Sequence, residues 1–373
     1  MPRSSPRPPQ LPSAIVDAFA LPVDGTTRLR IGMWGDSHIA AGFITDELTK
    51  FIEAKGLRVD TRNIPASVGR PGVRLPIRKV CKGDGWQFEA AYRGTAVVKV
   101  GSSLANLRST RAGDYLWLDL RHRDDHLVRV IEVRYLPPRR PASIGVRVDD
   151  GAEVRFELGE EGVLPIKATS SISTIKLRVL QGDFVLHGFT LDYREPSPVT
   201  IDVFGLPSAT MTAWSNADLS YLKKSIDSDS YDAIVLEYGT NEGAVDRFDS
   251  AKYAALLTES LRNMRVVFPD SACLLMGPTD RGVRIPQGKR TGRVDLLKYA
   301  RIHREIARIQ AQTGERFGCA LWDWQRDMGG PGSMYRWARE TPALAAADLI
   351  HLTPAGYRRT ANALAQSLGW LTP

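Results

Sequence analysis

The most constraining feature of the sequence is a change of hydrophobic pattern that happens twice along the chain. Residues 28–64 follow a strand, turn, helix pattern, and strands alternate with helices again from about residue 200 onward. Between them, residues 75–195 alternate apolar and polar side chains in short segments separated by Gly, Pro and Asp-Asp-Gly. Alternating strands and helices predict a mostly parallel sheet covered on both faces, and period-2 segments predict an antiparallel sandwich. We therefore expect an α/β fold interrupted by a β-sandwich.

This pattern divides the chain into three parts. We expect a discontinuous α/β domain of residues 28–74 and 196–373, an inserted β-sandwich domain of residues 75–195, and an N-terminal leader of residues 1–27. The leader starts MPRSSPRPPQLPS, which lacks the apolar core of a signal peptide and is rich in Pro and Ser. We expect it to be partly disordered. With 373 residues, 43% of them hydrophobic, the chain is long enough for one large domain or two.

Charge and hydropathy narrow the set of partners. The net charge of +8 favours acidic partners, but Lys and Arg are scattered without a run of five, and nucleic-acid-binding motifs are absent. We therefore expect no nucleic-acid partner. No stretch of 18 apolar residues occurs, so no membrane span is expected. The pattern leaves the oligomeric state and the compartment open.

The three cysteines are Cys81, Cys273 and Cys319. Their number is odd and their spacing does not match a metal site, so neither a disulfide framework nor a zinc site is indicated. Cys273 and Cys319 stand in apolar, strand-like runs, where buried and inert thiols are the default expectation. No metal site is predicted.

Three short polar segments follow or border predicted elements where an open α/β sheet gathers its reactive groups. The first, GDSH, places Ser37 at the start of a helix, where partial positive charge favours an oxyanion. The second, YGTNE, follows an apolar strand and carries Asn241, whose amide can donate to developing negative charge. The third, DLIH, precedes the last helix, and its spacing allows Asp348 to orient His351 as a general base.

Each segment alone also fits an ordinary structural role. Ser37 could be a helix cap, Asn241 a turn residue, and Asp348 and His351 capping residues. Their order and their common placement at strand ends of one α/β pattern favour chemistry instead. The sequence therefore predicts that Ser37, Asp348 and His351 form the catalytic triad of a serine esterase.

The set GDSH, GTNE and DLIHLTPAGY resembles the SGNH, or GDSL-type, esterase family over roughly residues 28–60 and 200–373. The resemblance implies a flavodoxin-like three-layer fold without metal or organic cofactor. It also implies roles for the triad. Ser37 attacks the ester carbonyl, His351 takes the serine proton and passes it to the leaving alcohol, and Asp348 orients His351.

The same resemblance implies an oxyanion hole made of the Ser37 N–H, the Asn241 side chain and a further backbone N–H. The family has a glycine at that last position, often within Gly-x-x-Gly, but this chain reads GLPSA. Ser208 stands where the second glycine is expected, and Gly205 is the alternative if the register differs. A side chain at Ser208 narrows the acyl pocket and needs a backbone conformation that a residue other than glycine tolerates.

The segments GDSHIAAGF, EYGTNEG and WDWQRDMGG, together with the β-rich insertion, resemble bacterial peptidoglycan O-acetylesterases, whose inserted module is carbohydrate-binding-like. This implies an esterase that removes O-acetyl groups from a polysaccharide, peptidoglycan first, through an acetyl-serine intermediate in the periplasm or cell envelope. Because no signal peptide is present, the cytoplasm stays open. Two alternatives remain: an O-acetyltransferase acting on a glycan, or a catalytically weak glycan-binding protein in which Ser208 disables the oxyanion hole.

Overall fold

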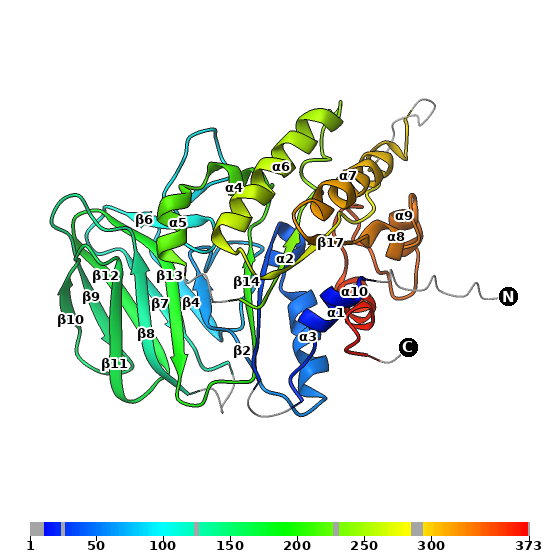
Figure 1. The fold of residues 1–373 in the computed structure, drawn as a ribbon. Coiled ribbons are helices and arrows are strands. Elements are labelled where there is room, and N and C mark those ends of the chain that lie inside the picture. Colours follow the sequence, from blue (N-terminus) through cyan, green and yellow to red (C-terminus); the bar gives the residue numbers. More distant parts are fainter. Residues whose placement is uncertain (1–10, 24–26, 123–126, 227–230, 285–293, 372–373) are drawn as a thin grey trace.

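The computed structural model describes residues 11–23, 27–122, 127–226, 231–284 and 294–371. In Figure 1, two antiparallel sheets form a sandwich on the left, and a parallel sheet with its helices lies on the right. The sandwich is inserted into the α/β part between the first strand–helix unit and the rest. The predicted fold class is confirmed.

The parallel sheet has six strands in the order β17-β16-β15-β1-β14-β2. Their bounds are β1 (Leu29–Gly35), β2 (Val59–Asp60), β14 (Val199–Gly205), β15 (Ala233–Glu237), β16 (Ala272–Met276) and β17 (Cys319–Trp322). Strand β1 pairs in parallel with both β14 and β15, so it lies inside the sheet. The carboxyl ends of parallel strands meet at one edge, so the segment after β1 and the segment after β15 leave the sheet side by side.

Helices cover both faces of this sheet because alternate side chains of each strand point to opposite faces. Ile31 and Met33 of β1 enter one apolar core, and Trp34 enters the other. The first core is closed by α1 (Ser13–Ala18), α2 (Ser37–Ala40), α3 (Phe43–Glu53), α8 (Trp324–Asp327), α9 (Ser333–Trp337) and α10 (Pro354–Ser367). The second is closed by α4 (Thr212–Asn216), α5 (Leu219–Ser225), α6 (Ser250–Val267) and α7 (Lys298–Glu315).

The inserted sandwich has its own apolar core between two antiparallel sheets. One sheet contains β3 (Asn63–Pro65), β5 (Gln87–Ala90), β6 (Ala105–Ser109), β8 (Val128–Tyr135), β11 (Val163–Ile172) and β13 (Phe184–Tyr193). The other contains β4 (Lys79–Lys82), β7 (Tyr115–Asp119), β9 (Ser143–Val148), β10 (Val154–Glu157) and β12 (Thr174–Gln181). Strand β3, which precedes residue 75, pairs with β13 of the sandwich.

The inserted segment is joined to the α/β part by buried contacts rather than by a linker. Val100 and Leu104 of the insertion are buried in the same core as Trp34. The indole N–H of Trp34 donates to the Ser102 carbonyl oxygen at 2.7 Å, and the Asn216 amide donates to the Ala91 carbonyl oxygen at 2.9 Å. Since polar groups buried in a core are satisfied across the junction, the two parts are held in one arrangement.

Part of the leader, residues 11–23, is described in the structure. Residues 13–18 form helix α1, and Ile15 and Phe19 are buried against the parallel sheet. The Trp370 indole N–H donates to the Phe19 carbonyl oxygen at 2.7 Å, which ties this helix to the C-terminal end. The Pro- and Ser-rich start of the leader obscured two apolar residues four positions apart, which is a helical spacing. Residues 1–10 lie outside the described residues.

The cysteine prediction is corrected as well. Cys273 and Cys319 form a disulfide between β16 and β17, where they stand directly opposite each other in the parallel register. Both are buried as expected, but they are paired rather than inert thiols. Sequence spacing of 46 residues could not reveal this pairing, because it depends on which strands become neighbours. Cys81 is a free, partly exposed thiol.

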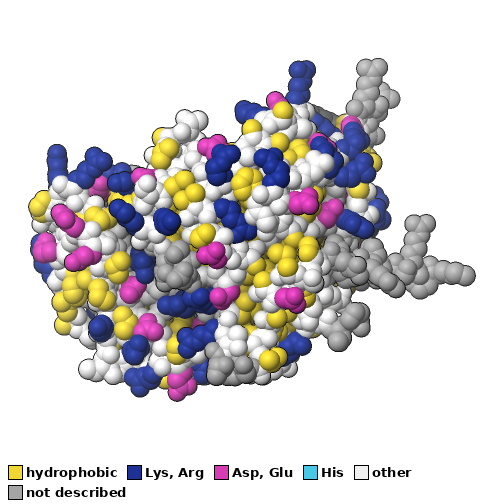
Figure 2. All heavy atoms as spheres, viewed as in Figure 1, with side chains coloured by type: hydrophobic (Ala, Val, Ile, Leu, Met, Phe, Trp, Pro, Cys, Tyr) yellow, Lys and Arg dark blue, Asp and Glu magenta, His cyan; other side chains and the backbone are white. Residues whose placement is uncertain are grey.

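The molecular surface is mixed in charge. Figure 2 shows Lys and Arg side chains dispersed over one face and interspersed with Asp and Glu. No helix among the described residues is long and apolar enough to cross a bilayer.

Candidate active site

The turn after β1 places Ser37 at the first position of helix α2. Asp36 is the N-cap, and its carboxylate accepts a hydrogen bond from the His38 N–H at 2.9 Å. Gly35 makes the turn possible, because a Cβ there would come within 2.8 Å of the Glu237 carboxylate. At the first turn of a helix the backbone N–H groups have no acceptor within the helix, so the Ser37 N–H is available to a bound anion.

The predicted triad residues lie together and in the required order. Ser37 Oγ is 2.9 Å from His351 Nε2, and His351 Nδ1 is 2.6 Å from Asp348 Oδ2. The other Asp348 oxygen accepts the backbone N–H groups of Ile350 and His351, at 2.9 Å each. This arrangement fixes the triad loop, residues 348–351, and leaves Nε2 to accept the serine proton when Nδ1 carries hydrogen.

Electrostatics keep the orienting carboxylate ionised. Partial burial raises the pKa of Asp348, but its hydrogen bonds with His351 and the Ile350 N–H outweigh this, so the pKa lies below the ordinary value. The side chains of His351 and Asp348 are 40% and 42% exposed. Both side chains are therefore accessible from solvent.

His38 lies behind the triad, a position that no sequence pattern beyond its place in GDSH indicated. It is fully buried, its Nδ1 is 3.0 Å from the Tyr357 hydroxyl, and its ring centroid is 5.5 Å from that of His351. Burial, followed by the proximity of His351, lowers the pKa of His38 to about 3. A neutral His38 adds no positive charge beside His351, so it does not oppose protonation of the His351 ring.

A buried pair of carboxyl groups supports the turn that carries Ser37. Glu237, the last residue of β15, accepts the Asp36 N–H at 3.1 Å, and both side chains are fully buried. Burial raises the pKa of Asp36 to about 6, and burial together with Asp36 raises the pKa of Glu237 well above its ordinary value. The pair therefore retains a proton to higher pH than free carboxyls do, which limits the negative charge beneath Ser37.

Asn241, which the sequence predicts as an oxyanion donor, lies beside the turn that carries Ser37. Its side-chain nitrogen is 3.1 Å from Asp36 Oδ2 and 2.9 Å from the Ala209 carbonyl oxygen. The amide nitrogen has two hydrogens, and both are used in these bonds. An oxyanion that bound to this amide would therefore have to share one of the two hydrogens with its present acceptor, or displace that acceptor. These bonds tie the asparagine loop, residues 239–242, to the turn and to the loop after β14.

The two candidates for the remaining donor differ in conformation. Ser208 has φ +68°, in the left-handed region that glycine favours. Gly205 ends β14, and a Cβ on it would overlap the backbone of Ala40 in α2, so its role is close packing. The Pro207 carbonyl accepts the Tyr92 hydroxyl at 2.9 Å, which anchors this loop to the insertion. The two positions therefore differ in role: Ser208 lies in a left-handed loop conformation, and Gly205 packs against α2.

Replacing Ser208 by Gly is expected to raise the free energy of unfolding by about 0.5 to 1 kcal/mol, because it removes a side chain from a left-handed backbone. A wider acyl pocket should also raise the ratio of butyryl to acetyl ester hydrolysis. Urea denaturation and two chromogenic esters measure both effects. Ser208→Ala is the matched control, since it keeps the Cβ atom and therefore does not relieve the strain of the left-handed backbone. A Gly variant no more stable than the Ala variant would contradict the prediction.

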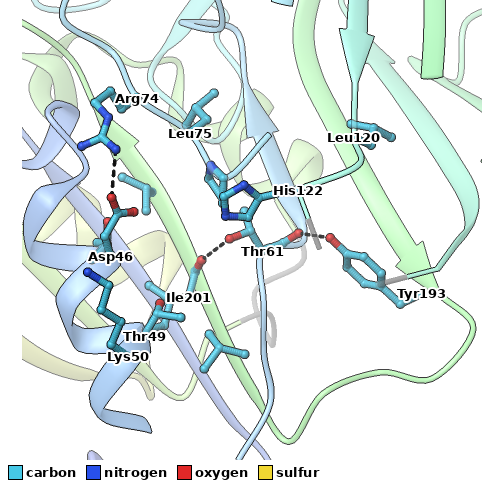
Figure 3. Close-up of a pocket in the computed structure, with 14 residues that line it drawn as sticks. Asp46, Thr49, Lys50, Thr61, Arg74, Leu75, Leu120, His122, Tyr193 and Ile201 are labelled. Carbon is cyan, nitrogen blue, oxygen red and sulfur yellow. Dashed lines mark hydrogen bonds and ion pairs between the residues drawn. The ribbon is translucent and has the colours of Figure 1, made fainter. Parts of the chain in front are cut away.

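A separate cavity of about 250 Å³ lies between α3 and the insertion (Figure 3). Its charged groups are already engaged: Arg74 pairs with Asp46 at 3.1 Å. Thr61 accepts the Tyr193 hydroxyl through its carbonyl oxygen at 2.7 Å and donates to the Ile201 carbonyl oxygen through its hydroxyl. No triad residue lines this cavity, so it is distinct from the site around Ser37.

Comparison with known proteins was made at the levels of sequence and structure. No family model matches the sequence, and no curated protein matches it. A solved structure described as a peptidoglycan O-acetylesterase in action superposes with a TM-score of 0.69 at 20% identity, covering 96% of this chain and 93% of that one.

More distant structures also match. They include a family two carbohydrate esterase with a carbohydrate-binding domain from Corynascus thermopiles (Myceliophthora fergusii), with TM-score 0.30 at 12% identity, covering 76% of this chain and 100% of that one. An acetyl xylan esterase matches with TM-score 0.30 at 15% identity, covering 45% and 80%. These two similarities are too weak to support a conclusion. Along nearly its whole length, the chain shares the fold of the peptidoglycan O-acetylesterase.

Proposed function

We propose that the protein is a serine esterase that removes O-acetyl groups from a polysaccharide, with peptidoglycan as its substrate. The observation that carries this proposal is the continuous chain from Ser37 Oγ through His351 to Asp348, at 2.9 and 2.6 Å, at the carboxyl edge of the parallel sheet. A serine, a histidine base and an orienting carboxylate in this geometry are the elements of acyl transfer.

The geometry supports a two-step reaction. His351 Nε2 removes the Ser37 proton as Oγ bonds to the acetyl carbonyl carbon, and the carbonyl oxygen becomes an oxyanion. The Ser37 N–H at the start of α2 and the Asn241 amide are the proposed donors to that oxyanion. When the oxyanion collapses, the bond to the sugar oxygen breaks, and that oxygen takes the proton from His351. The acetyl group remains on Ser37.

Water completes the cycle. His351 removes a proton from water as its oxygen attacks the acetyl-serine carbonyl, and collapse of the second oxyanion releases acetate and returns the proton to Ser37. The ionised Asp348 stabilises the imidazolium formed in both steps. Each step uses only groups of this chain and water, so protons and electrons balance without a further reactant.

The exposure of the triad suits a polymer. Because His351 and Asp348 are each about two-fifths exposed, a glycan chain can pass over the site without entering a closed pocket. The Cys273–Cys319 disulfide supports a location in the periplasm or cell envelope, since disulfides persist mainly in oxidising compartments. Substrate and compartment are thus proposed together.

Acetate release tests the proposal. Purified protein is incubated with O-acetylated peptidoglycan and, separately, with acetylated xylan, and acetate is quantified over time. We expect release from both and faster release from peptidoglycan at equal acetyl content. Peptidoglycan incubated after mild alkaline removal of its acetyl groups is the control. No acetate from either glycan, or newly acetylated sugar in place of acetate, would contradict the proposal.

A further inference from the structure

Two buried carboxyl groups, those of Asp36 and Glu237, lie in contact next to Ser37. Asp36 follows β1 and Glu237 ends β15, and the parallel register places Gly35 directly opposite Glu237. Glu237 Oε2 accepts the Asp36 N–H at 3.1 Å, and the two side-chain carboxyl groups are also within hydrogen-bonding contact. Both residues are fully buried. Because a proton on this pair is hidden from solvent, the surrounding hydrogen bonds decide which carboxyl group carries it.

These hydrogen bonds are distributed unequally over the pair. Asp36 Oδ1 accepts the His38 N–H at 2.9 Å, and Asp36 Oδ2 accepts the Asn241 amide at 3.1 Å. Among the described residues, no group donates a hydrogen bond to Glu237 Oε1, which is buried. A buried carboxylate oxygen without a donor is costly, whereas a protonated carboxyl group can itself donate. Glu237 is therefore assigned the proton, and the neighbouring Asp36 carboxylate is its acceptor.

The charges around the pair favour the same assignment. Burial is the largest influence and raises both pKa values, and Asp36 and Glu242 raise the pKa of Glu237 further. The His38 N–H, the hydrogen bond with Glu237, His351 and Arg281 lower the pKa of Asp36, which reaches only about 6. Two further titratable groups beside the pair are phenols whose pKa values are raised by burial, Tyr238 and Tyr357. At neutral pH the pair is therefore one acid and one carboxylate.

The Asp36 carboxylate connects the two halves of the candidate site. Through Oδ1 it binds the start of helix α2, which carries Ser37, and through Oδ2 it binds the asparagine loop. The Glu237 carboxyl group is the further partner that orients this carboxylate from β15. If Glu237 lost its proton, two like charges would be in contact without solvent, and their repulsion would push the carboxylates apart. The position of the Asn241 amide relative to Ser37 therefore depends on the proton of Glu237.

We propose that Glu237 is a positioning residue that acts as a protonated acid, holding the Asp36 carboxylate, and through it the Asn241 amide, in the place that hydrolysis requires. This inference rests on the proposed function and adds a residue to the machinery of the same site. The role depends on a hydrogen-bond donor and not on the volume of the side chain. A residue that only filled space would tolerate any side chain of similar size.

Two substitutions of similar size separate donor from volume. Glu237→Gln keeps an acceptor for the Asp36 N–H and a donor for the Asp36 carboxylate. Its kcat on a chromogenic acetyl ester at pH 7 should stay within about threefold of the wild-type value, since one neutral donor replaces another. Glu237→Met has neither group and should lower kcat by about 10- to 100-fold, the usual effect of misplacing a catalytic group by about 1 Å. Thermal unfolding shows that both variants are folded.

The pH dependence of kcat is the readout that a space-filling role would not change. Glu237 is protonated below its raised pKa and charged above it, so wild-type kcat should fall as the pH rises through that pKa. Glu237→Gln has no proton to lose and should not show this alkaline fall. Glu242→Gln is the matched control, because it removes a neighbouring buried carboxyl group whose pKa burial raises to about 7, and it should keep the fall. Rates are corrected for uncatalysed hydrolysis.

Infrared spectroscopy detects the proton itself, without any turnover. At neutral pH the wild type should show the band of a protonated carboxyl group that Glu237→Gln lacks, and the band should disappear over the pH range in which kcat falls. Absence of this band, equal losses of kcat in the Gln and Met variants, identical alkaline profiles of wild type and Glu237→Gln, or loss of the fall in Glu242→Gln would each overturn the proposal. If the band is present but the wild type hydrolyses no acetyl ester, the proposed function fails instead.

Discussion

Replacing Ser37 by Ala is expected to lower kcat for acetyl ester hydrolysis on the order of 10⁴- to 10⁶-fold, because the covalent step loses its nucleophile. The chain from Ser37 Oγ to His351 and Asp348 means that the three residues act as a unit. His351→Ala should therefore cost nearly as much. Asp348→Asn should cost less, since the base remains but loses the carboxylate that orients it and stabilises its charge.

The measurement combines steady-state hydrolysis with labelling. Wild-type protein should react with a serine-directed fluorophosphonate, and Ser37→Ala should not. Ser220→Ala, an exposed serine in α5, is the matched control and should retain both activities. Because the Ser37 variant removes only one oxygen, its thermal unfolding should match that of the wild type. Undiminished hydrolysis by Ser37→Ala would show that the triad does not carry the reaction.

Loss of the disulfide is expected to have the largest effect on stability. Replacing Cys273 and Cys319 together by Ala should lower the free energy of unfolding by about 4 kcal/mol, the loop-closure entropy for a bridge spanning 46 residues. The bridge joins neighbouring strands β16 and β17, so the edge of the parallel sheet should be the first part to open. Among the described strands, β17 lies at the edge of the parallel sheet and pairs only with β16.

Urea denaturation under oxidising and reducing conditions checks this effect. Reductant should destabilise the wild type and leave the double variant unchanged, which separates loss of the bridge from loss of packing. Cys81→Ala is the matched control, because that thiol is unpaired and partly exposed. If alkylation of the unfolded, unreduced protein labels all three cysteines, the disulfide is not present and the prediction is wrong.

Local patterns in the sequence distinguish helices from strands, but they define less well where each helix or strand begins and ends. The apolar pattern of residues 213–226 fits a single helix, but the structure has α4 and α5, separated where Ala217 is extended and Asp218 caps the second helix through the Tyr221 N–H. Residues 95–100 also fit a short strand, but they form none, and Val98 makes only an isolated bridge to Ala217. Both differences arise where the insertion packs on the α/β part, so tertiary contacts overrode local propensity.

The candidate site divides in the same way. Ser37, Asn241, Asp348 and His351 were found because each is next to a strand or helix end, and the carboxyl ends of parallel strands meet at one edge. Glu237 was missed because it looks like the last residue of an apolar strand.

The sequence by itself determined the α/β class, the inserted sandwich and the residues proposed as the triad, because these depend on periodicity and on chain neighbours. Tertiary structure alone decided the Cys273–Cys319 bridge, the buried contacts that join the insertion to the α/β core, and the left-handed conformation of Ser208. Those features depend on pairs of residues far apart in the chain, or on how a loop is held at both ends. Their energies arise only when the strands have taken their places in the sheet.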